Sequence, residues 1–111
     1  MEVSELDILS KSDWGHVRLI NGTEILHLRF KQISFNLNDI ELEYFIEELK
    51  NKNLHVCFST YLGDRIFIHA AMLNLDFVFT QEEKEELLKL LIEASLIFKT
   101  RRIIKYNTTK K

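Results

Sequence analysis

The chain of 111 residues contains no proline, three glycines and a single cysteine. Without proline and with so little glycine, no flexible linker marks a domain boundary, so we expect one domain, residues 1–111. Because Cys57 stands alone, the sequence excludes an internal disulfide and a cysteine-cluster zinc site. It also favours a reducing, cytoplasmic location.

Strong charge of one sign and long apolar runs are missing too. The net charge of −2 argues against a strongly basic nucleic-acid-binding protein. The longest apolar-rich stretch, residues 87–98, is interrupted by charged residues and is too short to cross a bilayer. The N-terminal part of the sequence has no apolar run with basic flanks, so we expect no signal peptide. We therefore expect no association with a membrane.

What the chain does carry is a weak internal repeat with a period of 42 residues. Residues 14–55 align without a gap on residues 56–97, and turn signals, strand alternation and helix starts fall in register. The identical pairs are His27/His69, Phe35/Phe77, Glu41/Glu83, Glu43/Glu85, Leu49/Leu91 and Leu54/Leu96. A period of this length indicates two copies of one structural unit.

Each copy predicts three strands followed by a helix. In the first copy the strands are 17–20, 23–30 and 33–37, and Asn38 caps a helix over residues 39–50. In the second copy they are 56–61, 65–72 and 75–79, and Thr80 with Glu83 forms the capping box of a second helix. The predicted fold class is therefore α+β: two β-β-β-α repeats forming an antiparallel sheet with two helices packed on one face.

The turn signals predict which residues lie opposite one another. A two-residue turn at Asn21-Gly22 sets the register of the first hairpin. In this register the apolar residues lie on the face that the helices cover, and the opposite face is left uncovered. It pairs Val17 with Leu26, His16 with His27, and Trp14 with Arg29. A turn at Gly63-Asp64 pairs Phe58 with His69, Thr60 with Phe67, Val56 with Ala71, and Cys57 with Ala70. Cys57 would then be buried and unreactive.

The uncovered sheet face is predicted to mix aromatic, aliphatic and imidazole side chains. A sheet face open to water should be more polar, so this face is the candidate binding surface. Its residues are Trp14, His16, Arg18, Ile25, His27, Arg29, Val56, Phe58, Phe67 and His69.

Candidate chemistry on this face is sparse. His16 and His27 suggest a metal site or a pH-sensitive contact, but no further ligand is placed to complete a metal set, so we expect no metal or cofactor. No catalytic motif is present, and we favour a protein that is not an enzyme. Trp14 near Arg18 and Arg29 could stack a planar ligand, although a tryptophan covering the sheet edge is the favoured interpretation.

Residues 99–111 form the one strongly basic segment, a predicted C-terminal tail. Its candidates for contact with nucleic acid or an acidic partner are Lys99, Arg101, Arg102 and Lys105. The acidic N-terminus, with Glu2, Glu5, Asp7 and Asp13, is an alternative partner within the chain.

The segment Leu28–Leu49, LRFKQISFNLNDIELEYFIEEL, resembles a pattern in small single-domain proteins of Bacteroidota whose function is uncharacterised. These proteins show a hairpin, a phrase such as L-x-F-x-N-I-x-F-x-L, and then a helix with an acidic cap. Gln32 stands here where the pattern has asparagine. The resemblance covers about a fifth of the chain and implies no activity or site.

Two functional hypotheses follow. The first is a non-enzymatic cytoplasmic interaction module that forms a homodimer through the uncovered sheet face. The alternative is a ligand-binding or nucleic-acid-binding domain that uses this face together with the basic tail. The sequence leaves the strand order between the repeats open.

Overall fold

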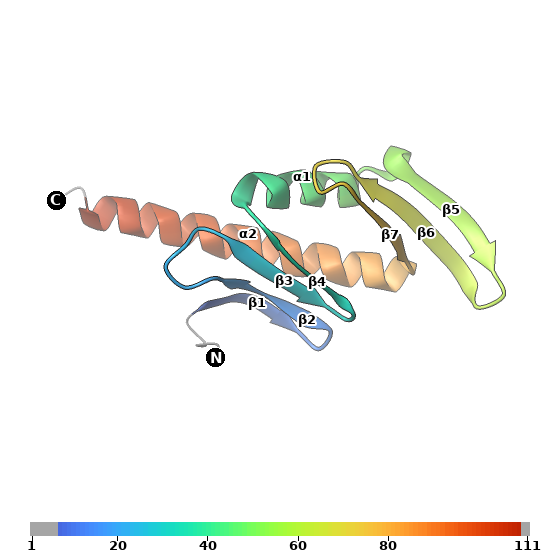
Figure 1. The fold of residues 1–111 in the computed structure, drawn as a ribbon, viewed down its shortest axis with the longest axis horizontal. Helices are drawn as coiled ribbons and strands as arrows, with labels where there is room; N and C mark the ends of the chain where they lie inside the picture. Colours follow the sequence, from blue (N-terminus) through green and yellow to red (C-terminus); the bar gives the residue numbers. More distant parts are fainter. Residues whose placement is uncertain (1–6, 110–111) are drawn as a thin grey trace.

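The computed structural model describes residues 7–109, with side chains as far as Lys105, and confirms an α+β fold of strands and two helices (Figure 1). The elements are, in chain order, β1 (Ile8–Ser12), β2 (Gly15–Leu19), β3 (Leu26–Phe30), β4 (Ile33–Leu37), α1 (Asp39–Lys50), a 3-10 turn (Lys52–Leu54), β5 (His55–Thr60), β6 (Gly63–Ala70), β7 (Leu75–Phe79) and α2 (Gln81–Thr109).

The strands form two antiparallel sheets rather than one. Sheet A has the order β1-β2-β3-β4, and sheet B has the order β5-β6-β7. Each sheet is a meander in which neighbours in sequence are neighbours in space. The C-terminal end of α2 and the β5–β6 hairpin lie at opposite ends of the molecule, which measures 58 × 30 × 20 Å (Figure 1).

The 42-residue period is visible in the strand-to-helix junctions. β4 and β7 are offset by this number, as are the first residues of α1 and α2. Both helices begin with a capping box. The side chain of Asn38 accepts a hydrogen bond from the Glu41 N–H (2.8 Å), and that of Thr80 accepts from the Glu83 N–H (3.1 Å). Each glutamate in turn accepts from its cap N–H at 2.8 Å.

The core lies between the inner faces of the sheets and the two helices. Val17, Leu28 and Ile68 are fully buried, as are Phe45 of α1 and Leu91 of α2. The repeat-related pair Phe35 and Phe77 meets across the junction of the two sheets, with ring centroids 6.1 Å apart. Phe45 stacks on Phe77 at 5.2 Å, so aromatic packing joins both units through α1.

The first hairpin has a different register from the predicted one. Residues 20–25 form a longer loop instead of a two-residue turn, and Val17 lies opposite Leu28 rather than Leu26. The predicted pairing of His16 with His27 is wrong: His16 lies opposite Arg29, and His27 opposite Arg18. Because the slip is two residues, each side chain stays on its predicted face.

The second hairpin also slips by an even number. Its turn is at Tyr61-Leu62, so Val56 lies opposite Phe67 and Cys57 opposite Ile66. Cys57 therefore keeps its predicted face, but the prediction that it is buried is wrong, because Cys57 is exposed. The reason is that β5 packs mainly on β6 and lies beyond the cover of the helices.

Two features of the fold were not predicted. β1 adds a fourth strand to sheet A, and buried Ser10 donates a hydrogen bond to the Leu90 carbonyl of α2 (2.8 Å). The basic segment continues α2 to Thr109 rather than forming a tail. None of the described helices combines the length and apolar character needed to cross a membrane.

Candidate interaction surfaces

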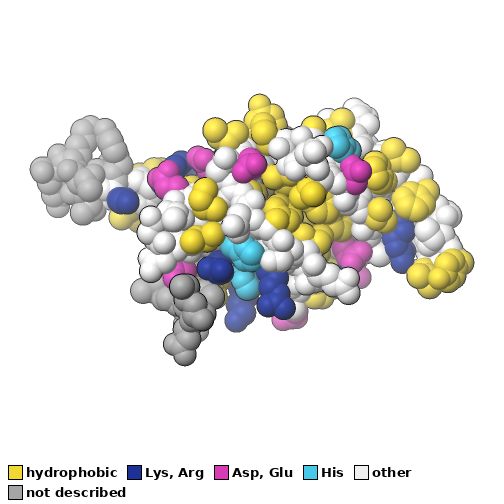
Figure 2. All heavy atoms as spheres, in the orientation of Figure 1, with side chains coloured by type: hydrophobic (Ala, Val, Ile, Leu, Met, Phe, Trp, Pro, Cys, Tyr) yellow, Lys and Arg dark blue, Asp and Glu magenta, His cyan; other side chains and the backbone are white. Residues whose placement is uncertain are grey.

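The outer faces of the two sheets differ in chemistry. Side chains of lysine, arginine and histidine gather over the strands of sheet A, whereas apolar side chains dominate over sheet B and its hairpin tip (Figure 2). The sequence predicted one mixed face. The structure resolves this face into a basic surface and an apolar surface.

The basic surface consists of Lys11, His16, Arg18, His27 and Arg29 on the outer face of sheet A. In one cross-strand row Lys11, His16 and Arg29 lie side by side, and Arg18 and His27 occupy the next row. A shallow hollow of about 480 Å³ lies over this surface and over the β3–β4 turn, and no aspartate or glutamate lines it. Lys11 is the member that the sequence missed, because β1 was not predicted.

The electrostatics of this surface are visible at His16. Burial lowers the pKa of His16, and the nearby charges of Arg18, His27, Arg29 and Lys11 lower it further. His27 is held through both ring nitrogens: Nδ1 lies 2.6 Å from Asn36 Oδ1 and Nε2 lies 3.1 Å from Ser34 Oγ.

The apolar surface consists of Val56, Phe58, Phe67 and Val78 on the outer face of sheet B. Val56, Phe67 and Val78 form one cross-strand row over β5, β6 and β7. Val78 was not among the predicted residues, although the inward positions of Phe77 and Phe79 in the same strand indicate that it points outward. His69 borders this surface, with Nδ1 2.5 Å from Asp76 Oδ1 on β7.

Strand β5 is the free edge of sheet B. Its sequence, HVCFST, contains no proline and no residue with a full charge, and most of its side chains are exposed. The adjoining turn exposes Tyr61 at 96% and Leu62 at 69%. Natural edge strands usually carry charges, proline or bulges that prevent pairing with another chain, and β5 has none of them.

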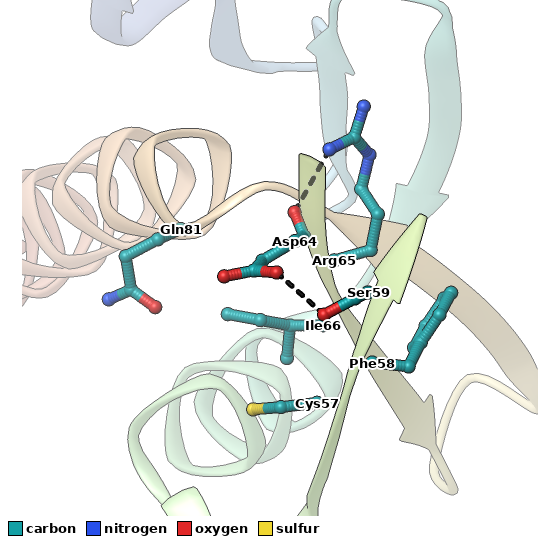
Figure 3. A pocket seen from close by; sticks show the side chains of 7 residues that line it. All are labelled: Cys57, Phe58, Ser59, Asp64, Arg65, Ile66 and Gln81. Atoms are coloured by element: carbon teal, nitrogen blue, oxygen red, sulfur yellow. Dashed lines mark hydrogen bonds between the residues drawn. The ribbon is translucent and has the colours of Figure 1, made fainter. Parts of the chain in front are cut away.

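On the inner side of the same strand, Cys57 lines an open hollow of about 350 Å³ with Ser59, Asp64, Ile66 and Gln81 (Figure 3). Ser59 Oγ donates to Asp64 Oδ1 at 2.9 Å. Arg65 also lines this hollow, and Phe58 projects away from it (Figure 3).

Two predicted members of the binding face lie elsewhere. Trp14 is in the β1–β2 turn, where its ring meets Phe30 edge-on (centroids 5.9 Å apart) and Lys31 Nζ lies 4.2 Å from its ring centroid. It therefore covers the edge of the core, which was the favoured interpretation. Ile25 lies in the loop before β3 and is partly exposed.

The basic segment of α2 is engaged within the molecule. Lys99 Nζ lies 2.9 Å from Glu43, and Arg102 bridges Glu24 and Asp39 at 2.7 Å each. Arg101 and Lys105 also line a small hollow beside Phe98. Glu2 and Glu5 lie outside the described residues. The partners observed for Lys99 and Arg102 are thus in α1 and the β2–β3 loop.

Metal-binding residues do not gather in the described part of the chain. Within residues 7–109 no group of three or more histidine, cysteine, aspartate or glutamate side chains could hold an ion. His16 and His27 lie diagonally across β2 and β3, without a carboxylate among the residues lining their hollow.

Residues 1–110 match a family of unknown function, DUF6686, and the chain belongs to this family. No curated protein and no solved structure matches the chain. The family covers nearly the whole chain, whereas the resemblance found in the sequence covered one segment. The bacterial source implied by that resemblance stays a prediction.

Proposed function

We propose that this member of the DUF6686 family is a non-enzymatic interaction module that forms a homodimer through the free edge and apolar surface of sheet B. The observation that carries the proposal is the unprotected edge strand β5, which contains no lysine, arginine, aspartate or glutamate and exposes most of its side chains. The lone cysteine agrees with a reducing, cytoplasmic location.

The apolar surface supports the same interface. Val56 and Val78 are 59% and 55% exposed, and Phe67 lies between them. Contiguous exposed apolar side chains usually mark a contact surface, because covering them removes apolar area from water. The row ends at β5, so pairing at this edge would extend it into the row of the partner.

A second copy is the occupant that this chemistry fits. Two antiparallel copies of β5 satisfy one another's unpaired backbone groups, as a symmetric interface requires. A strand without charge meets no repulsion from an identical strand. The resulting sheet would have six strands, and the projecting position of the β5–β6 hairpin leaves room for the partner (Figure 1).

The test is the absolute mass of the protein in solution, measured by light scattering on a sizing column. We expect the wild-type chain to give twice the mass of its 13.2 kDa monomer. The variant Val56→Glu should be monomeric, because it places a charge in the apolar row. Ile40→Glu is the matched control, since Ile40 is equally exposed (59%) but lies on α1.

A monomeric wild-type protein at high concentration would refute the proposal. A dimer that survives Val56→Glu would place the interface elsewhere on the molecule.

The second candidate, binding of a ligand or nucleic acid, is favoured by the basic surface of sheet A. The basic end of α2 adds less support, since Lys99 and Arg102 are already ion-paired.

A further inference from the structure

We propose that the basic surface of sheet A binds the phosphate group of a small molecule, with Arg18 and Arg29 as its principal ligands. The proposal is independent of the homodimer, because it concerns the other sheet. It stands on three observations: the placement of the cations, their lack of partners, and the chemistry of the surrounding hollow.

The placement suits a single tetrahedral anion. Arg18 and Arg29 lie diagonally on neighbouring strands, at a spacing that is typically about 7–8 Å between such positions. Their long side chains can therefore converge on one group. Lys11 extends the row of Arg29 on the β1 side. The planar donor fork of arginine matches the oxygen geometry of phosphate.

The cationic side chains of this surface lack the carboxylate partners that several other lysine and arginine side chains of the molecule have. The side chains of Arg18, Arg29 and Lys11 form no hydrogen bond or ion pair with any described residue, whereas those of Lys31, Lys99 and Arg102 each contact a carboxylate. Within the described residues, the side-chain hydrogen bonds of this surface are those of His27 with Asn36 and Ser34 on β4. A bound anion would relieve the mutual repulsion of three charges that no acid of the hollow neutralises.

A small phosphate compound fits better than nucleic acid. Single-stranded nucleic acid is usually held by exposed aromatic rings on which bases stack, and no phenylalanine, tyrosine or tryptophan of the described residues lines this hollow. Trp14 lines a different hollow, and its ring contacts Phe30 and Lys31. The chain as a whole is also negatively charged, which opposes a long polyanion.

The first experiment follows the imidazole resonances of His16 and His27 by NMR while inorganic phosphate is added at constant ionic strength. A saturable shift is expected with phosphate and with glycerol 3-phosphate, but not with sodium chloride. Bound phosphate should also raise the pKa of His16, since the anion offsets the cations that lower it. Comparing the affinities of the two probes distinguishes a free phosphate ligand, which would bind more tightly as the inorganic ion, from an organic monoester, which would bind more tightly as glycerol 3-phosphate.

Variants test the assigned ligands. Arg18→Gln and Arg29→Gln should each weaken phosphate binding at least about tenfold, the loss expected for a charge-assisted hydrogen bond. Arg29→Lys should also weaken it, since lysine keeps the charge but lacks the fork. Lys89→Gln, which removes an exposed cation on α2, is the control and should bind as the wild type does. Thermal unfolding of every variant checks the fold.

Several results would overturn the proposal. The first is a shift of the histidine resonances that is as large with chloride as with phosphate. The second is phosphate binding that is unchanged in both Arg18→Gln and Arg29→Gln. The third is a loss of phosphate affinity in Lys89→Gln equal to that in the arginine variants. Binding of an oligothymidylate whose affinity grows with length, without any binding of phosphate or glycerol 3-phosphate, would replace it with nucleic-acid binding.

Discussion

At the scale of single residues, Glu48 is the least expected group in the molecule. It lies in α1 with only 8% of its surface exposed, and its Oε2 accepts a hydrogen bond from the Ala71 N–H after β6 (2.7 Å). Its Oε1 is buried and has no hydrogen-bond partner among the described residues. Nearby, His55 Nε2 lies 3.0 Å from the Glu48 carbonyl. One side chain thus ties the first helix to the second sheet.

We expect Glu48→Ala to lower the free energy of unfolding by about 2 kcal/mol, because it leaves the Ala71 N–H without its acceptor. Glu48→Gln keeps an acceptor oxygen and removes the charge at the unpaired position, so its loss should be smaller. Urea unfolding measures both. Glu47→Ala, at an exposed position of the same helix, should change stability by less than about 0.5 kcal/mol.

At the scale of elements, the contact between α1 and α2 is reinforced by polar groups at its margin. Glu43 accepts a hydrogen bond from Ser95 Oγ at 2.5 Å and pairs with Lys99. Burial raises the pKa of Glu43, but the hydrogen bonds from Ser95 and Lys99 outweigh this effect, and the pKa lies below its usual value. The charged form of Glu43 therefore stabilises the folded state.

The sign of the pH dependence follows from this lowered pKa. The contribution of Glu43 is complete above the pKa of an unfolded glutamate, about 4.3, and is lost as the pH falls through the lower pKa of the folded state. Glu43→Gln should cost about 0.5–1 kcal/mol at neutral pH, a modest figure since the side chain is 41% exposed.

Urea unfolding at a series of pH values provides the check. Below the folded-state pKa the Gln variant and the wild type should converge in stability. A difference between them that stays constant down to acid pH would show that the carboxylate charge is not the cause.

The elements also show why the two sheets have different exposed faces. In sheet A the outward positions of β2 and β3 are basic, whereas sheet B carries four outward apolar side chains with Arg65, His69 and Asp76 beside them. His27 and His69 occupy related positions, and each contacts a side chain on the next strand of its own meander, Asn36 and Asp76 respectively. The two sheets thus share this local contact, whereas their outer surfaces differ in charge.

At the scale of the whole molecule, the chain is extended for its length. The Cα radius of gyration is 15.4 Å, whereas a compact chain of this length is expected near about 13 Å. The excess comes from two projections, the C-terminal half of α2 and the β5–β6 hairpin (Figure 1). A projecting hairpin with a free, neutral edge is the shape that pairing with a second copy would complete.

The lone cysteine provides a test of this assembly. Cys57 is exposed and lies in the edge strand, so pyrene attached to its thiol should show excimer fluorescence if two copies of β5 pair antiparallel. Diluting labelled protein with an excess of unlabelled protein should abolish the excimer. A dimer by light scattering that lacks the excimer would indicate an interface away from β5. The unlabelled variant Cys57→Ser, measured by light scattering, shows whether the dimer forms without the thiol.

Particular residues show how far prediction from sequence reached. The capping boxes at Asn38 and Thr80 and the α+β class are confirmed. The inward positions of Val17 and Leu28 are confirmed even though both hairpin registers were wrong. Prediction failed for the exposure of Cys57 and the pairing of His16 with His27, and it missed β1.

The sequence by itself determined what depends on near neighbours along the chain. A cap needs two residues three positions apart, and the face on which a strand residue lies depends on alternation, which any register shift by an even number preserves. Only the tertiary structure decided which residues face one another, where the sheet divides, and which strand is left uncovered. Those outcomes depend on the packing of Phe35, Phe45 and Phe77 from distant segments, and on how far the two helices extend over β5.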